Sequence, residues 1–293
     1  MKHLRSVLLS FCCVVATCDA APVVEIPLAF DRAGIPMIDI GVDGQALRLY
    51  LDTGARGLHL PRAVAESIAG LRLSGRKNTS VDLAGKLRED ETFLIPELHM
   101  AGMTFHQVAG QYLSPWGLGR AEYELPVIGL DVLLSKNLVI DFPHQRLLLS
   151  DEPIDFEALY PAVHQLPFIR AEEGLVVAVQ VGNRAWPYVL DTGASISITK
   201  ASANLDASLL APCEIPLPQG RCEAVAGHID SGDLSIPLQL IRMPLPERFK
   251  PMGIIGADLF SRCALYIGKG SDALKLSCAE STGHRPTPVN ANR

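Results

Sequence analysis

Two aspartates are candidates for acid–base chemistry, because each begins a copy of the same tetrapeptide. Asp52 begins one Asp-Thr-Gly-Ala copy and Asp191 begins the other, 139 residues later. An apolar run typical of a buried strand precedes each copy, at residues 47–51 and 186–190. Two carboxyl groups held a few ångström apart share one proton, because both cannot easily ionise. One can then act as a general base on water while the other acts as a general acid, with neither metal nor cofactor.

The three residues after each aspartate suit a buried carboxyl pair. A threonine hydroxyl can bond across to the opposite strand, and a glycine lets backbone N–H groups approach the carboxylates. A single Asp-Thr-Gly would be explained by an ordinary turn, but here the two copies share a fourth residue and similar flanks. The supporting positions are Thr53, Gly54 and Ala55 in the first copy and Thr192, Gly193 and Ala194 in the second.

A second repeated element follows each tetrapeptide. The pattern apolar-apolar-Gly-x-Asp occurs at residues 127–131 and again, 127 residues later, at residues 254–258. We expect Asp131 and Asp258 to cap the short helices that follow rather than to contact a substrate. The period is too long for a solenoid, and it fits a duplicated half that pairs with its copy about a pseudo-twofold axis.

Turn and helix signals place these motifs among short strands. Asp-Gly at residues 43–44, between two apolar runs, predicts a hairpin. Residues 61–69 and 200–205 have the character of short helices. Two further hairpins, with tips near Gly85 and Gly220, are candidate flaps that would cover the aspartates and hold a substrate as an added strand. The alternative for each is an ordinary surface hairpin.

The two motifs together resemble those of the aspartic peptidases of the pepsin and retropepsin clan, whose signature is Asp-Thr/Ser-Gly followed later by apolar-apolar-Gly. Gly129 and Gly256 end the second element, which in that family forms a loop beneath the active-site strand. The resemblance covers about residues 25–278. It implies a mostly β, bilobal pepsin-like fold of two retropepsin-like β-barrel lobes with short helices and an active-site cleft between the lobes. It also implies that Asp52 and Asp191 form a catalytic dyad.

The tetrapeptide departs from pepsins at its fourth residue. Eukaryotic pepsins carry Ser or Thr there, and its hydroxyl bonds to the catalytic carboxylate; Ala55 and Ala194 cannot do so, as in retroviral proteases. Because losing a hydrogen bond to the ionised form raises a carboxyl pKa, we expect a pH optimum in the mildly acidic to near-neutral range. The halves are short for pepsin lobes, so the chain resembles a bacterial protein in which two retropepsin-like halves are fused.

The first twenty residues have the pattern of an export signal. Lys2 and Arg5 precede an apolar run that is too short to span a bilayer, and small residues stand before Ala21. A lipid anchor at Cys18 is the alternative reading of this segment. We expect an exported protein, periplasmic or secreted, without a transmembrane anchor. The expected organisation is a signal peptide at 1–20, an N-terminal lobe at 21–155, a C-terminal lobe at 156–280 and a disordered tail at 281–293.

Four cysteines would remain once such a signal is removed, and an even number in an exported chain favours disulfides. Pairing Cys213 with Cys222 and Cys263 with Cys278 would close two short local loops, although four cysteines allow three pairings and sequence alone does not choose among them. Free buried thiols are the alternative. The spacing offers no tight Cys or His clamp for zinc, so we expect no metal.

Composition limits the partners of the chain. Its 293 residues are 48% hydrophobic and 20% charged, which suffices for a sizeable core in two lobes. The net charge of −6 argues against nucleic acid or an anionic membrane as the main partner. We therefore predict a monomeric aspartic endopeptidase that cuts extended polypeptides between apolar residues and needs no cofactor. The alternatives are a non-catalytic peptide- or protein-binding module on the same fold and a hydrolase with a non-peptide or very narrow substrate.

Overall fold

The computed structural model describes residues 23–81, 87–113, 125–213 and 222–278. The segments expected to be a signal peptide and a tail lie outside these residues. In the first half, the elements are β1 (Val24–Phe30), β2 (Pro36–Val42), β3 (Gln45–Asp52), β4 (Leu58–Leu60), α1 (Arg62–Ser67), β5 (Arg72–Val81), β6 (Leu87–Met100), β7 (Met103–Tyr112), β8 (Val127–Gly129), α2 (Leu130–Leu133), β9 (Asn137–Asp141) and β10 (Arg146–Ser150).

The second half repeats this order of elements after a short connection. Its elements are α3 (Phe156–Leu159), β11 (His164–Pro167), β12 (Ile169–Ala171), β13 (Gly174–Val181), β14 (Arg184–Leu190), β15 (Ile198–Lys200), the 3-10 helix η1 (Ala207–Leu209), β16 (Leu210–Pro212), β17 (Glu223–Ser231), β18 (Leu234–Met243), β19 (Gly253–Ile255), α4 (Ala257–Phe260), β20 (Cys263–Ile267) and β21 (Ala273–Cys278). The fold is mostly β, as expected.

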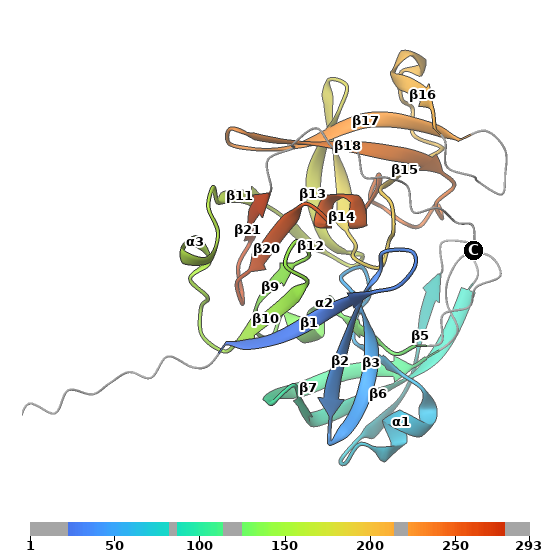
Figure 1. The fold of residues 1–293 in the computed structure, drawn as a ribbon. Coiled ribbons are helices and arrows are strands. Elements are labelled where there is room, and N and C mark those ends of the chain that lie inside the picture. Colours follow the sequence, from blue (N-terminus) through green and yellow to red (C-terminus); the bar gives the residue numbers. More distant parts are fainter. Residues whose placement is uncertain (1–22, 82–86, 114–124, 214–221, 279–293) are drawn as a thin grey trace, which may run out of the picture.

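The strands form two large sheets, and one of them joins the halves. Its order is β11-β21-β20-β9-β10-β1-β2-β3-β8-β4-β7-β6-β5, while the other runs β12-β13-β14-β19-β15-β18-β17-β16. Antiparallel pairing of β20 with β9 links a strand of the second half to one of the first. In Figure 1, β13 to β18 lie above, β2 to β7 lie below, and β9, β10, β20 and β21 lie between them. We keep the lobe boundary after residue 155 as a proposal; it falls at the start of α3.

Each half contains the same strand crossing next to its tetrapeptide. The strand β8 runs parallel to β3 and antiparallel to β4, with Asp52 opposite Gly129. In the second half, β19 runs parallel to β14 and antiparallel to β15. The apolar residues just before each aspartate and each anchor glycine are at most 2% exposed: Leu51, Ile128, Leu190 and Ile255. Burial of these apolar side chains in the core therefore holds the two tetrapeptides in position.

Most local expectations agree with the structure. Asp43 and Gly44 both have positive φ, 46° and 82°, as a two-residue type I′ turn between β2 and β3 requires. The helix α1 begins after Pro61 and ends before Gly70. The expected helix at residues 200–205 is wrong, because Lys200 ends β15 opposite Met243. Pairing with a distant strand thus overrides the local preference.

Both expected disulfides are present. Cys213 is bonded to Cys222 and Cys263 to Cys278. The second bond joins directly opposed residues of β20 and β21. Among the described segments, no helix has the length and apolar character needed to cross a membrane.

Candidate active site

The structure brings Asp52 and Asp191 together from opposite halves of the chain. Asp52 is the last residue of β3, and Asp191 directly follows β14. The two carboxyl groups lie close enough for each to perturb the pKa of the other. Each loop also contacts the other aspartate: a Cβ atom added to Gly54 would lie 2.6 Å from Cγ of Asp191, and one added to Gly193 would lie 2.7 Å from Cγ of Asp52. Only glycine at these two positions leaves room for the carboxyl groups to meet.

The threonines of the two tetrapeptides bond across the junction, as expected. The Thr53 hydroxyl donates to the Leu190 carbonyl at 2.9 Å and accepts from the Thr192 N–H at 2.9 Å. The Thr192 hydroxyl donates to the Leu51 carbonyl at 2.6 Å and accepts from the Thr53 N–H at 3.0 Å. Both threonines are buried. Four reciprocal hydrogen bonds thus fix the two loops relative to each other.

Backbone N–H groups of each loop donate to its own aspartate. Oδ1 of Asp52 accepts from Gly54 N at 2.8 Å and from Ala55 N at 3.1 Å. Oδ1 of Asp191 accepts from Gly193 N at 2.8 Å. These bonds orient both carboxyl groups.

Burial raises the pKa of both carboxyl groups above the usual range of an aspartate. For Asp191 the negative charge of Asp52 adds to burial, so its pKa lies well above that range. For Asp52 the rise is opposed by hydrogen bonds from Asp191 and from the Gly54 N–H, and by the charge of His59. Because two carboxyl groups this close cannot both ionise easily, the pair holds one proton between them.

The two anchor glycines lie directly beneath the tetrapeptide loops. A Cβ atom at Gly129 would lie 2.6 Å from the Ala55 carbonyl oxygen, and one at Gly256 would lie 2.6 Å from the Ala194 carbonyl oxygen. The backbone is this close because Leu130 N donates to the Ala55 carbonyl at 3.1 Å, and the next half repeats the bond. The anchors therefore support both loops from below.

Asp131 and Asp258 do not cap their helices, so that expectation is wrong. The N-cap residues of α2 and α4 are glycines, without a side-chain hydrogen bond. The Asp131 carboxylate accepts from the N–H of its neighbour Val132 and from that of Gly57, and the Asp258 carboxylate accepts from the hydroxyl of Ser197. Both aspartates thus bond to the chain that follows a tetrapeptide.

The flap tips proposed at Gly85 and Gly220 lie outside the described residues. The strands on either side of each tip do pair, with Val81 opposite Leu87 and Pro212 opposite Glu223. Hairpins therefore exist at both places, and their role as flaps stays a prediction. Within the described residues, no cluster of His, Cys, Asp or Glu could hold a metal ion.

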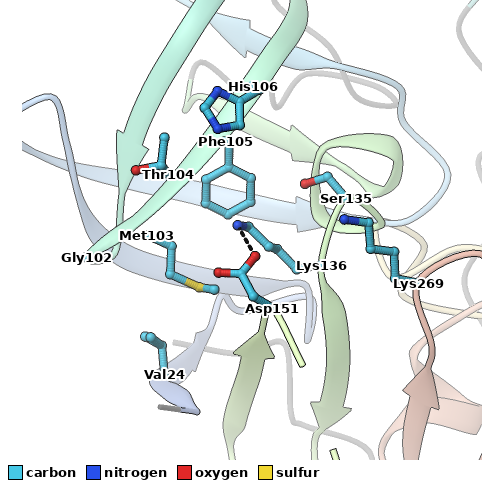
Figure 2. Close-up of a pocket in the computed structure, with 10 residues that line it drawn as sticks. All are labelled: Val24, Gly102, Met103, Thr104, Phe105, His106, Ser135, Lys136, Asp151 and Lys269. Atoms are coloured by element: carbon cyan, nitrogen blue, oxygen red, sulfur yellow. Dashed lines mark hydrogen bonds and ion pairs between the residues drawn. The ribbon is translucent and has the colours of Figure 1, made fainter. Parts of the chain in front are cut away.

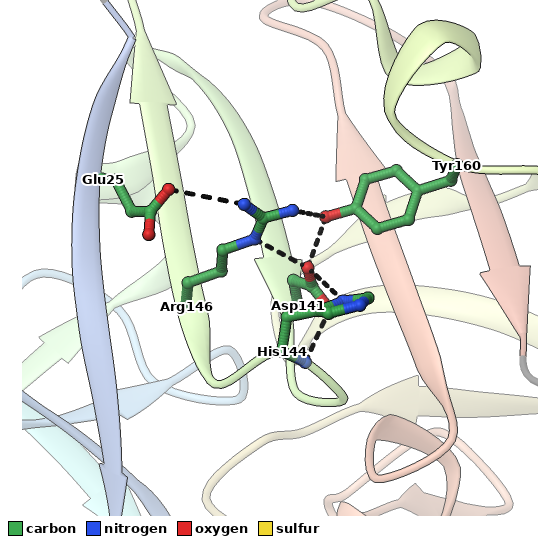
Figure 3. Close-up of polar contacts among 5 residues, drawn as sticks. All are labelled: Glu25, Asp141, His144, Arg146 and Tyr160. Carbon is green, nitrogen blue, oxygen red and sulfur yellow. Dashed lines mark hydrogen bonds and ion pairs between the residues drawn. The ribbon is translucent and has the colours of Figure 1, made fainter.

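Sequence reasoning missed a buried carboxylate at the junction of the halves. Asp141, at the end of β9, accepts from the Tyr160 hydroxyl at 2.5 Å, from Arg146 Nε at 2.9 Å and from His144 Nδ1 at 2.9 Å (Figure 3). Arg146 also pairs with Glu25 of β1 at 3.4 Å. Like Asp52, Asp141 follows an apolar strand, but no Thr-Gly follows it. We call these four residues, Asp141, His144, Arg146 and Tyr160, the clasp, because their hydrogen bonds tie together segments of the sheet that the two halves share.

A cavity of about 510 Å³ lies apart from the paired aspartates (Figure 2). Inside it Lys136, whose side chain is 8% exposed, pairs with Asp151 at 2.5 Å. No residue of either tetrapeptide lines the cavity. The lining residues are Val24, Gly102, Met103, Thr104, Phe105, His106, Ser135, Lys136, Asp151 and Lys269.

A sequence-family model described as aspartyl protease matches residues 38–132 of this chain. The match includes the first tetrapeptide and the first anchor glycine. A comparison with curated protein sequences finds no significant match.

Solved structures share the fold over nearly the whole chain. Basic 7S globulin from soybean has a TM-score of 0.59 and 10% identity, covering 93% of this chain and 99% of the globulin. Conglutin gamma, a basic 7S globulin from lupine seeds, has a TM-score of 0.58 and 9% identity, covering 90% and 96%. An aspartic proteinase from Irpex lacteus has a TM-score of 0.58 and 10% identity, covering 92% and 100%. The family model supports the resemblance to aspartic peptidases at residues 38–132, and at 9–10% identity the solved structures show the pepsin-like fold alone.

Proposed function

We propose that this chain, which has a pepsin-like fold and an aspartyl protease match at residues 38–132, is an aspartic endopeptidase. One observation carries the proposal. The carboxyl groups of Asp52 and Asp191 meet at the junction of the halves, each against the glycine of the other tetrapeptide, and the threonine bonds hold them there. A binding protein has no need of two partly buried carboxyl groups whose pKa values are raised.

The protonation of the pair sets the role of each aspartate. Asp52 is ionised and takes a proton from a water molecule as its oxygen attacks the peptide carbonyl carbon. Asp191 is protonated and donates to the carbonyl oxygen, which becomes the second hydroxyl of a tetrahedral intermediate. The proton held by Asp52 then passes to the leaving nitrogen, and Asp191 recovers its own proton as the carbonyl reforms. Protons balance over the cycle, and the reaction consumes one water.

The substrate in this proposal is an extended polypeptide with apolar residues on both sides of the cleaved bond. An extended chain can add as a strand beside an active site built from strand ends. The protein acts as a monomer after export, to the periplasm or outside the cell, and the two disulfides support an oxidising compartment. Residues 1–20 serve as the export signal, with a lipid anchor at Cys18 as the alternative.

A second candidate is a non-catalytic module that binds peptides or proteins. It is favoured by the names of two structures with this fold, which are a basic 7S globulin and conglutin gamma rather than proteinases. The intact pair of aspartates weighs against it.

Peptide cleavage by the chain without residues 1–20 tests the proposal. We would incubate it with a diverse peptide library beside Asp52→Asn and Asp191→Asn, and identify products by mass spectrometry. Asp233→Asn is the matched control, because it makes the same chemical change on a side chain that is 93% exposed. We expect cleavage by the parent and the control, and none by either dyad variant.

The other outcomes are equally informative. Cleavage that survives in Asp52→Asn or Asp191→Asn would refute the dyad. If the parent cleaves no peptide, but binds peptides when it is immobilised on a column, the proposal of a non-catalytic binding module would be supported and that of an endopeptidase refuted.

A further inference from the structure

The aspartate two residues after each anchor glycine bonds to the chain that follows the tetrapeptide of its own half. Oδ1 of Asp131 accepts from Gly57 N at 2.5 Å. Oδ1 of Asp258 accepts from the Ser197 hydroxyl at 2.6 Å. Gly57 and Ser197 lie five and six residues after the aspartates of their tetrapeptides. The same carboxylate therefore reaches the same loop in both halves.

These carboxylates complete a two-way attachment between anchor and loop. In the first half, Gly129 N donates to the Gly57 carbonyl at 2.8 Å, so Gly57 is held at its oxygen by the anchor backbone and at its N–H by Asp131. In the second half, Gly256 N donates to Ser197 Oγ at 3.1 Å, and the same hydroxyl donates to Asp258. Neither loop can shift without breaking a hydrogen bond to the carboxyl group of an aspartate.

The two halves use different donors for this attachment. Gly57 has a φ of +74° and offers its backbone N–H. The residue at the same 139-residue offset is Ile196, and the donor there is the side chain of Ser197. The counterpart of Ser197 is Leu58, which is fully buried and apolar. A contact kept in place by two unrelated donors points to a requirement for the carboxylate itself.

We infer that Asp131 and Asp258 are positioning residues that hold the Asp52 and Asp191 loops in register through Gly57 and Ser197. The inference rests on the proposed function. Both act through the loop: the attachment keeps the N–H groups after each tetrapeptide aspartate aimed at its Oδ1 atom. Asp131 is exposed, so it can be replaced without opening the core.

The test compares a variant that removes the acceptor with one that keeps it. Asp131→Ala removes the acceptor of the Gly57 and Val132 N–H groups, whereas Asp131→Asn retains an amide oxygen at the same place. We expect Asp131→Ala to lower kcat at least tenfold, which is about 1.4 kcal/mol of transition-state stabilisation, with KM within threefold. We expect Asp131→Asn to keep kcat within threefold of the parent. Asp206→Ala is the control, because Asp206 also accepts from a backbone N–H, that of Ser208, but outside both loops.

A pH profile separates positioning from a general loss of structure. Loosening the loop weakens the bonds from Gly54 N and Ala55 N to ionised Asp52, and losing such bonds raises a carboxyl pKa. The acidic limb of kcat/KM should therefore move to higher pH in Asp131→Ala and stay in place in Asp131→Asn. The inference would be overturned if Asp131→Ala left both kcat and the acidic limb of the kcat/KM profile unchanged. It would also be overturned if Asp131→Asn lost as much kcat as Asp131→Ala.

The second half gives an independent check. Ser197→Ala and Asp258→Ala remove the two ends of one bond, so the double variant should lose no more activity than the worse single variant. Additive losses would contradict a shared attachment.

Failure of the proposed function is distinguishable from failure of this inference. If the parent cleaves nothing, the carboxyl titration of the paired aspartates is followed by NMR in the parent, Asp131→Ala and Asp131→Asn. If the apparent pKa of the pair rises in Asp131→Ala but not in Asp131→Asn, the positioning role is supported. If it is the same in all three proteins, the positioning role is refuted.

Discussion

Replacing Thr53 by valine should strongly destabilise the protein, because valine keeps the shape and removes the hydroxyl. The change leaves the Leu190 carbonyl without its donor and the Thr192 N–H without its acceptor. Thr192 is fully buried and Leu190 is 2% exposed, so water cannot replace the lost partner. An unsatisfied buried polar group costs roughly 1–3 kcal/mol, so two such groups cost about 2–6 kcal/mol.

Urea unfolding followed by circular dichroism measures this cost from the shift in the midpoint at constant slope. Thr53→Ser is the matched control, because it keeps the hydroxyl and loses only a methyl group worth about 0.8 kcal/mol. The double variant Thr53→Val/Thr192→Val should show clear non-additivity, since the two hydroxyls belong to one set of four bonds.

Two results would refute this reasoning about the threonines. One is a cost below about 0.5 kcal/mol for Thr53→Val, the size of an ordinary surface change. The other is a serine variant that unfolds as easily as the valine variant, because packing of the methyl group would then explain the loss.

Two further predictions concern pH. Burial alone would raise the pKa of Asp141, but hydrogen bonds from Tyr160, Arg146 and His144 outweigh it and lower the pKa; the stabilisation is therefore present above the usual aspartate range and is lost as pH falls through the lowered pKa. Melting temperatures measured from pH 7 to pH 2 should drop less steeply in Asp141→Asn than in the parent, and parallel curves would contradict the clasp. For the endopeptidase, both dyad pKa values are raised, so kcat/KM should peak between mildly acidic and near-neutral pH; a maximum below about pH 3 would count against the paired-carboxyl mechanism.

Features that depend on neighbours in sequence could be predicted from the sequence. The Asp-Gly pair at residues 43–44 demands positive φ at both positions, and only a tight hairpin turn provides it. Cysteines separated by 9 and 15 residues close short loops, which favoured the observed pairing over the other two. The repeated tetrapeptide predicted a pair of carboxyl groups, because a duplicated half carries its motif twice.

Features that depend on contacts across the fold could not be predicted. Lys200 has the local sequence of a helix but ends β15, because pairing with Met243 of a distant strand is worth more than one helical turn. Asp131 and Asp258 resembled helix caps because both stand at the start of a helix. Their bonds to the tetrapeptide loops reach residues 74 and 61 positions away.

The sequence by itself determined that two Asp-Thr-Gly-Ala loops exist, each at the end of a buried strand, since apolar periodicity and a repeated motif are properties of the chain alone. Only the tertiary structure decided how the loops meet. The crossed bonds of Thr53 and Thr192, and the glycines that admit each other's carboxyl group, join residues 139 positions apart. Such contacts form only when both halves have folded and closed on each other, so no local pattern specifies them.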